Sequence, residues 1–283
     1  TRKNDGTTWS PKNYDGQYHG DVTLRQVIEA SINVPSVKLA ETVGATRLKR
    51  QLNRMGISRA TTLPSTALGA FESTALEMAG AYAAFPNGGT HHAPSILQAL
   101  HSAQGKTIYT HIPESRKVAS ERAAALATSV LLGVVTSGTG TSAARYGAIG
   151  NIGGKTGTTN GYRDAWFAGF TPNIAVAVWV GRDKSGAVGL SGSRAALPTW
   201  AQFIKASGSM NRPLQWPKSV TKIPVCIESL QAAMPGCEHV YEEFVSKDEI
   251  PSPACELHGG LIDEISKGLS DLFPWGWKRE KNK

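Results

Sequence analysis

The chain has 283 residues, of which 40% are hydrophobic and 18% are charged, and this balance excludes a disordered or coiled-coil protein. No apolar stretch approaches the roughly 20 residues that a membrane-spanning helix needs. Thirty basic residues against 22 acidic ones give a net charge of +8, which fits an anionic partner. The basic residues are scattered along the chain, however, so charge alone does not indicate a binding surface.

The first half of the chain is predicted to be mainly helical. Asp21 or Thr23, Thr74 and Ser120 are suited to capping helices that follow them. In chain order, helices are predicted over residues 23–31, 37–55, 75–85 and 121–135. Between the last two, residues 94–109 are typical of two short strands around a Gln-Gly turn. The pair His91-His92 lacks a third metal ligand at useful spacing and is interpreted as loop.

The region that follows is the most sheet-like part of the sequence. Strands are predicted over residues 149–158, 164–171 and 174–182. Asn160-Gly161 and Pro172-Asn173 mark the turns between them, which indicates antiparallel pairing. A helix is predicted near 197–206, beginning around Pro198. Helices first and sheet later, without alternation of strand and helix, predict an α+β fold.

The composition changes beyond Ser207, where prolines and all three cysteines of the chain gather. This predicts a loop-rich extension over residues 208–283. No cysteine stands in a Cys-x-x-Cys pair and no histidine spacing beside them suggests zinc, so no metal site is expected. Cys226 and Cys237 would close a short loop in an oxidising compartment. The alternative is that these two residues and Cys255 are ordinary thiols.

A glycine-rich run, Gly-Gly-Lys-Thr-Gly-Thr-Thr at residues 153–159, first suggests a phosphate-binding loop. That motif needs a further glycine at the position occupied by Ile149, and it must open a helix. Here the run leads through Asn160-Gly161 into an apparent strand. Nucleotide binding is therefore not expected.

The Lys-Thr-Gly-Thr segment at 155–158 has a second interpretation. On the edge of an antiparallel sheet it places an ammonium group, two hydroxyls and closely approachable backbone beside a groove. Such groups can hold the carboxylate of a peptide. Lys-Thr-Gly is the third motif of penicillin-binding proteins and class A β-lactamases, and the second is Ser-x-Asn or Ser-Asp-Asn. Ser31-Ile32-Asn33 matches the second motif and precedes Lys155, as the order requires.

With their surroundings, these motifs resemble the transpeptidase domain of class A, bifunctional penicillin-binding proteins over nearly the whole chain. The resemblance rests on residues 9–16, 20–24, 31–37, 76–89, 155–167 and 179–181. It implies the fold shared with serine β-lactamases, an antiparallel sheet flanked by helices, with a partial transpeptidase domain over residues 1–207. The tail with its three cysteines and His258 resembles that family's cysteine-bearing C-terminal extension.

The resemblance also implies a chemistry. In the family a serine attacks the D-Ala-D-Ala carbonyl of a peptidoglycan stem peptide, and an amine of a second stem resolves the acyl-enzyme. β-Lactams acylate the same serine. Ser31 would relay a proton, Asn33 would bind the substrate amide and Lys155 would set a positive potential. The implied substrate-binding residues are Thr156, Gly157, Thr158 and Thr159. Neither a cofactor nor nucleic acid is expected.

One part of the family pattern is expected to be missing. The nucleophile belongs to a Ser-x-x-Lys motif upstream of Ser-x-Asn, but the one such string here begins at Ser219, after Lys155 and between two prolines. We therefore expect the acylated serine, the family's glycosyltransferase domain and the N-terminal membrane anchor to lie outside the chain. The chain would then be inactive alone. The alternative is a non-catalytic module that binds stem peptides or a partner.

The resemblance finally implies a compartment. Peptidoglycan is cross-linked outside the cytoplasmic membrane, so an extracytoplasmic, periplasmic location is expected. Cysteines oxidise there. This favours a Cys226–Cys237 disulfide, with Cys255 free or differently paired.

Overall fold

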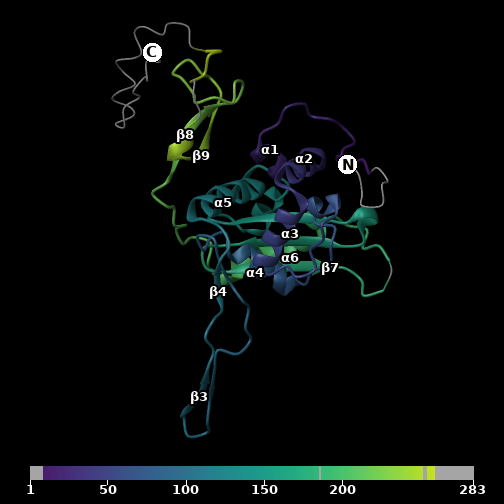
Figure 1. The fold of residues 1–283 in the computed structure, drawn as a ribbon, viewed down its shortest axis with the longest axis vertical. Helices are drawn as coiled ribbons and strands as arrows, with labels where there is room; N and C mark the ends of the chain where they lie inside the picture. The colour runs from purple at the N-terminus through teal and green to yellow at the C-terminus, as the bar shows by residue number, and fades with distance from the viewer. Residues whose placement is uncertain (1–8, 185, 251–253, 259–283) are drawn as a thin grey trace. The chain divides into compact units, whose positions relative to one another are not determined.

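The computed structural model describes residues 9–184, 186–250 and 254–258 (Figure 1). The chain separates into two compact units, Thr1–Pro217 and Lys218–Lys283. The boundary lies later than the change in composition after Ser207. Asn151 explains why: its backbone N–H donates to the Met210 carbonyl at 3.0 Å and its side chain to the Arg212 carbonyl at 2.9 Å. Residues 259–283 of the predicted extension lie outside the described residues.

The helices of the first unit begin largely where capping residues predict. They are α1 (Leu24–Glu29), α2 (Asn33–Val43), α3 (Ala45–Arg54), α4 (Ala75–Ala83), α5 (Glu121–Thr136) and α6 (Gly192–Ser207), with the short 3₁₀ helices η1 (Pro64–Leu68), η2 (Thr141–Tyr146) and η3 (Asn160–Tyr162). Thr23 and Thr74 each form a capping box with the residue three positions on, and Ser120 caps α5. Each side-chain cap contributes about 1 kcal/mol.

Two helix predictions need correction. The single helix predicted over 37–55 is broken at Gly44, whose φ of +91° suits glycine, into α2 and α3. The helix predicted to begin around Pro198 begins at Gly192 and carries the proline inside it. A Cβ on Gly192 would lie 2.3 Å from the Trp166 carbonyl oxygen, so this glycine lets α6 start against the sheet.

The central sheet has three antiparallel strands in the order β5-β6-β7, as predicted: β5 (Gly153–Thr158), β6 (Ala165–Phe170) and β7 (Ala175–Val180). Side chains alternate between its two faces. On one face Phe167 packs on Trp200 of α6, with ring centroids 4.6 Å apart. On the other, Phe170 contacts Phe85, just after α4, and α4 and α5 cover this side. The sheet is thus held between helices, and β5 is one of its edge strands.

Two small sheets complete the first unit. β2 (Ala99–His101) pairs with β3 (Thr107–Thr110), which confirms the predicted hairpin. β1 (Thr90–His92) pairs with β4 (Ser115–Lys117), so the interpretation of His91-His92 as loop was wrong. The pairing was hidden because the two strands are three residues each and lie on either side of the hairpin.

The second unit contains one sheet in its described part. β8 (Val220–Cys226) and β9 (Val240–Ser246) are antiparallel, and the 3₁₀ helix η4 (Lys247–Glu249) follows. A loop-rich extension was predicted here from its prolines and cysteines, yet one of those prolines, Pro224, lies within β8. Pro224 is exposed on a two-stranded sheet, where proline is tolerated. None of the helices in the described ranges of either unit has the length and apolar character needed to cross a membrane.

Candidate active site

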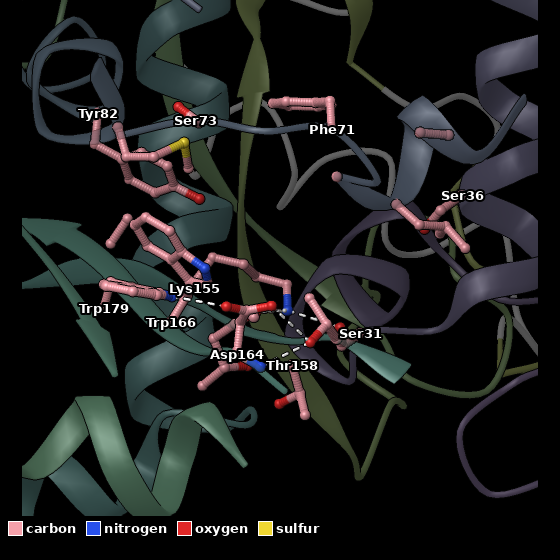
Figure 2. Close-up of a pocket in the computed structure, with 18 of the residues that line it drawn as sticks. Ser31, Ser36, Phe71, Ser73, Tyr82, Lys155, Thr158, Asp164, Trp166 and Trp179 are labelled. Atoms are coloured by element: carbon pink, nitrogen blue, oxygen red, sulfur yellow. Dashed lines mark hydrogen bonds between the residues drawn. The ribbon is translucent and has the colours of Figure 1, made fainter. Parts of the chain in front are cut away.

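A pocket of about 840 Å³ in the first unit contains every active-site residue predicted from the sequence (Figure 2). The turn after α1 contributes Ser31, the start of α2 contributes Asn33, and β5 with the residue after it contributes the run 155–159. β6 and β7 continue the β5 side of the pocket, and the segment that leads into α4 contributes a further wall. Segments more than a hundred positions apart in the sequence therefore meet at one site.

Lys155 and Ser31 make the contact that joins the two motifs. The Lys155 Nζ donates a hydrogen bond to Ser31 Oγ at 2.7 Å and another to the Thr156 carbonyl at 3.2 Å. Burial lowers the pKa of the Lys155 ammonium from 10.5 to about 8. The amine therefore stays mostly protonated at neutral pH, but it gives up its proton more easily than an exposed lysine does.

Ser31 is held in an unusual backbone conformation. Its φ is +58°, in the left-handed region that non-glycine residues rarely adopt. The turn is closed by the Ile32 N–H, which donates to the Val27 carbonyl at 2.9 Å, and α2 begins immediately afterwards. Strained residues of this kind cluster at functional sites, where surrounding structure over-determines them. Here the strain accompanies the placement of a hydroxyl beside Lys155.

Asn33 lines the pocket beside this turn, held by the N-terminal segment. Its Nδ2 donates to the Lys12 carbonyl at 2.9 Å. The neighbouring Asn13 accepts a hydrogen bond from the Val34 N–H at 2.9 Å, at the start of α2. Residues 12 and 13 thus fix the start of α2, where the Ser-x-Asn motif ends.

Hydrogen bonds from residues outside the sheet position the two threonine hydroxyls of β5. Thr156 Oγ1 lies 2.8 Å from the hydroxyl of Thr139, and Thr158 Oγ1 accepts the Gly192 N–H at 3.0 Å. Thr139 follows α5 and was not among the site residues predicted from the sequence. Its contact could not be predicted, because nothing in the sequence relates residue 139 to residue 156.

The aromatic part of the pocket was also not predicted from the sequence. Asp164 accepts hydrogen bonds from the Trp179 indole N–H at 2.9 Å and from the Thr159 hydroxyl at 3.1 Å. Trp166 lies against Trp179, with ring centroids 6.3 Å apart. Alternation along β6 and β7 was the available signal, because Trp166 and Trp179 are opposite each other in the strand register. These groups add an aromatic part to the pocket beside the polar residues of β5.

The arrangement suits an extended peptide that ends in a carboxylate. A buried cation and several hydroxyls lie along β5, whose outer edge has no strand partner among the described residues. Peptides bind such edges by adding as a further strand, with backbone hydrogen bonds for affinity and side-chain pockets for specificity. Lys155 and Ser31 also form a short path along which a proton can move.

The chain matches one protein-family model, described as the penicillin binding protein transpeptidase domain, over residues 1–202. It is 34% identical over 248 residues to penicillin-binding protein 1A of Aquifex aeolicus, which covers 86% of this chain and 34% of the relative. It is 30% identical over 240 residues to penicillin-binding protein 1B of Vibrio cholerae, covering 84% of this chain and 31% of the relative. The chain thus spans about a third of the length of these curated relatives.

Solved structures of penicillin-binding proteins share the fold of this chain. Penicillin-binding protein 1A from Haemophilus influenzae superposes with a TM-score of 0.80 at 26% identity, over 90% of this chain and 44% of that one. The imipenem acyl-enzyme complex of penicillin-binding protein A from M. tuberculosis superposes with a TM-score of 0.60 at 26% identity, over 71% of this chain and 52% of that one.

Proposed function

The chain belongs to the penicillin-binding protein transpeptidase family, and we propose that it is the substrate-positioning part of a peptidoglycan D,D-transpeptidase. The observation that carries the proposal is the 2.7 Å hydrogen bond from Lys155 to Ser31 within a pocket bordered by the Lys-Thr-Gly-Thr strand. The substrate would be a stem peptide ending in D-Ala-D-Ala, laid along β5. The full-length protein would act in the periplasm, anchored to the inner membrane, and would also carry a glycosyltransferase domain.

In this mechanism the terminal carboxylate binds next to Lys155, Thr156 and Thr158. The anion would raise the pKa of Lys155 again and hold its proton in place. When the D-Ala nitrogen leaves, Ser31 would relay to it the proton that the attacking serine gives up, while Lys155 keeps its own proton and supplies a positive potential. Asn33 would hydrogen-bond the substrate backbone, and the Thr158 N–H would be one oxyanion donor. A donor of this kind typically contributes about 3 kcal/mol to the transition state.

The acylating serine in this proposal comes from a Ser-x-x-Lys motif outside the 283 residues. The string that begins at Ser219 is a poor candidate, because Lys222 lies on strand β8 rather than on a helix. Residues three apart on a strand point to opposite faces, whereas on a helix they share one. The chain alone would therefore bind substrate without forming an acyl-enzyme. β-Lactams would acylate the serine of the complete protein; penicillin-binding protein A from M. tuberculosis forms an acyl-enzyme complex with imipenem.

Labelling with a fluorescent penicillin tests the proposal. The chain alone should remain unlabelled, and the same chain joined to its upstream segment should be labelled. In the joined protein Lys155→Ala should slow labelling about 10–100-fold, since a charge-assisted hydrogen bond contributes about 1.5–3 kcal/mol. Lys106→Ala, at an exposed lysine of the β2–β3 hairpin, is the matched control and should change nothing.

Two results would contradict the proposal. Stable labelling of the chain alone would mean that the nucleophile lies within it. Absence of labelling in the joined protein, together with equilibrium binding of a D-Ala-D-Ala peptide, would favour a non-catalytic stem-peptide-binding module instead.

A further inference from the structure

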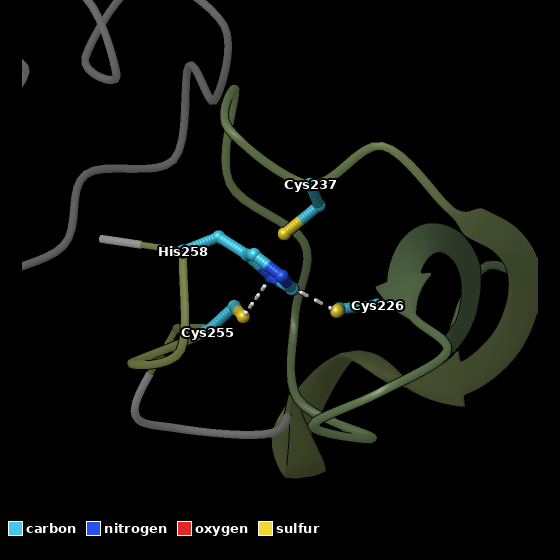
Figure 3. A group of neighbouring side chains, drawn as sticks. All are labelled: Cys226, Cys237, Cys255 and His258. Atoms are coloured by element: carbon cyan, nitrogen blue, oxygen red, sulfur yellow. Dashed lines mark hydrogen bonds between the residues drawn. The ribbon is translucent and has the colours of Figure 1, made fainter. Parts of the chain in front are cut away.

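The second unit gathers three thiols and an imidazole at one point (Figure 3). Cys226, Cys237, Cys255 and His258 each offer one ligand atom, and all four atoms lie within 4.8 Å of one another. His258 Nδ1 is 3.2 Å from Cys255 Sγ and 3.5 Å from Cys226 Sγ. Ligand atoms of a tetrahedral zinc site with Zn–S of about 2.3 Å and Zn–N of about 2.0 Å stand roughly 3.5–3.8 Å apart. The cluster needs only small adjustments to reach that geometry.

Backbone pairing brings the ligand-bearing segments together. Ala232 pairs with Val225 on one side and with Ala254 on the other. Cys226 and Cys255 each follow one of these paired residues, and the Cys255 N–H donates to the Ala232 carbonyl at 2.8 Å. The arrangement is therefore fixed by hydrogen bonds between strand-like segments.

The third segment, which carries Cys237, comes close to the His258 backbone at Gly236. A Cβ on Gly236 would lie 2.7 Å from the His258 carbonyl oxygen, so only glycine leaves room for the backbone here. Cys237 follows directly. Its N–H donates to the Met234 carbonyl at 2.9 Å in a tight turn.

Hydrogen bonds from surrounding groups orient the cluster residues, as they do around the ligands of a metal site. His258 Nε2 lies 3.1 Å from a carboxylate oxygen of Glu228, and the Met234 N–H points at Cys237 Sγ at 3.3 Å. A metal-binding histidine almost always donates its second ring N–H to a carboxylate, carbonyl or water, which fixes the tautomer. With the Nε2 proton directed at Glu228, the Nδ1 lone pair faces the three sulfurs.

The disulfide expected from the sequence does not account for this arrangement. Cys226 and Cys237 are free thiols in the structure, as is Cys255. A bridge between the first two would not require Cys255 and His258 to converge on the same point. The expectation of no metal site overlooked the Cys-x-x-His spacing at 255–258.

We propose that Cys226, Cys237, Cys255 and His258 bind one Zn²⁺ ion in the second unit. Four protein ligands complete a tetrahedron and leave no position for water or substrate, so the ion is structural rather than catalytic. The described part of this unit contains only one two-stranded sheet, and an isolated hairpin is marginally stable in water. The metal would tie the loops on either side of β9 to the end of β8.

Metal analysis of the whole chain tests the site. Purified without chelator, it should carry one zinc per chain. Replacement by Co²⁺ should give the intense visible absorption of tetrahedral thiolate coordination. His258→Ala and Cys255→Ser should weaken binding of added Zn²⁺ more than tenfold. His239→Ala, at an exposed histidine of the same unit, is the matched control and should bind as the unaltered chain does.

Two further variants keep the test independent of folding defects. His258→Cys retains four ligands, so it should still bind the metal, with a cobalt spectrum altered by the fourth thiolate. Glu228→Gln leaves the ligands intact and should weaken zinc binding about 10–100-fold.

The site would be refuted if the reduced, unaltered chain took up no Zn²⁺, or if His258→Ala bound Zn²⁺ as tightly as the unaltered chain. A Cys226–Cys237 disulfide in exported protein that binds no zinc after reduction would likewise refute it. The penicillin-labelling result has no bearing on these outcomes, so failure of this site and failure of the proposed function are distinguishable.

Discussion

The active-site pocket and the Cys/His cluster differ in how their residues are distributed along the chain. Five consecutive residues, 155–158 of β5 and Thr159 after it, line the pocket, so much of its chemistry can be read from one string. The four cluster residues are spread from 226 to 258 over three segments that backbone bridges bring together. A motif on one strand is visible in a sequence, whereas a ligand set assembled by loop pairing becomes visible only in the fold.

The two regions also differ in what stabilises them. Both apolar clusters found among the described residues lie in the first unit, the larger one around Trp200 and Phe167. The second unit has a hairpin and the proposed zinc ligands. Packing is therefore expected to dominate the stability of one region and ligation that of the other, and the predictions below test this contrast.

The largest effect is expected from removing the metal. Structural zinc in small domains binds with about 10–16 kcal/mol of apparent free energy, most of which is folding free energy. A chelator should therefore abolish hydrogen-exchange protection in β8 and β9 and leave β5–β7 protected. Persistent protection of β8 and β9 in the metal-free chain would show that packing is sufficient there.

The next effect is expected from the core of the first unit. Trp200 is fully buried, packs on Phe167 and donates its indole N–H to the Val176 carbonyl at 3.1 Å. Trp200→Ala should lower the free energy of unfolding of this unit by about 3–5 kcal/mol. Chemical denaturation measures the change, and zinc content should not alter. Phe203→Ala, at a half-exposed position of the same helix, should cost less than about 0.5 kcal/mol.

How far the sequence could predict these regions depends on the range of the interactions. Helix starts at Thr23, Thr74 and Ser120 were predictable because a cap acts over three residues. The strands of the central sheet were predictable from short turns between apolar runs. Long-range pairings were not: β1 with β4 is an example, and so is the contact between Thr139 and Thr156.

The same distinction applies within the candidate site. Lys155, Ser31 and Asn33 were placed in the pocket because their motifs match a family, not because their meeting follows from local physics. Asp164 and Trp179 lie in segments that also match the family, but no role was predicted for them, and their hydrogen bond depends on the register of β6 and β7. In the second unit the gathered prolines and cysteines predicted loops, but Pro224 lies within β8, at an exposed position of a two-stranded sheet.

A third prediction concerns the cost of burying Lys155. Its pKa is about 8 in the folded chain and 10.5 when unperturbed. Between these values the unfolded state binds more protons, so stability should rise with pH through this window; below it the penalty is constant. Lys155→Met should therefore stabilise the first unit at neutral pH by about 2–3 kcal/mol and remove that pH dependence.

Denaturation at about pH 7 and about pH 10 checks this, with Lys106→Met as the exposed control. A loss of stability in Lys155→Met at neutral pH would mean that the hydrogen bond to Ser31 outweighs the desolvation of the charge.

The smallest effect is expected at the capping box that starts α4, beside the pocket. Glu77 accepts hydrogen bonds from the Ser58 hydroxyl at 2.6 Å and the Thr74 N–H at 2.9 Å, which together lower its pKa from 4.5 to about 2. A lowered carboxyl pKa stabilises the fold above pH 4.5, and this stabilisation is lost as the pH falls towards 2. Because the side chain is partly exposed, the expected contribution is only about 1 kcal/mol.

Glu77→Gln should therefore unfold the first unit about 1 kcal/mol more easily at neutral pH and flatten its acid dependence. The exposed Glu72, paired with Arg59 at the surface, is the control: Glu72→Gln should change less than about 0.5 kcal/mol. Acid also protonates zinc ligands, so the second unit should lose its metal at low pH in both variants alike. If Glu77→Gln shifted the pH of metal loss, the two regions would be energetically coupled, and the contrast between a packed unit and a ligated one would fail.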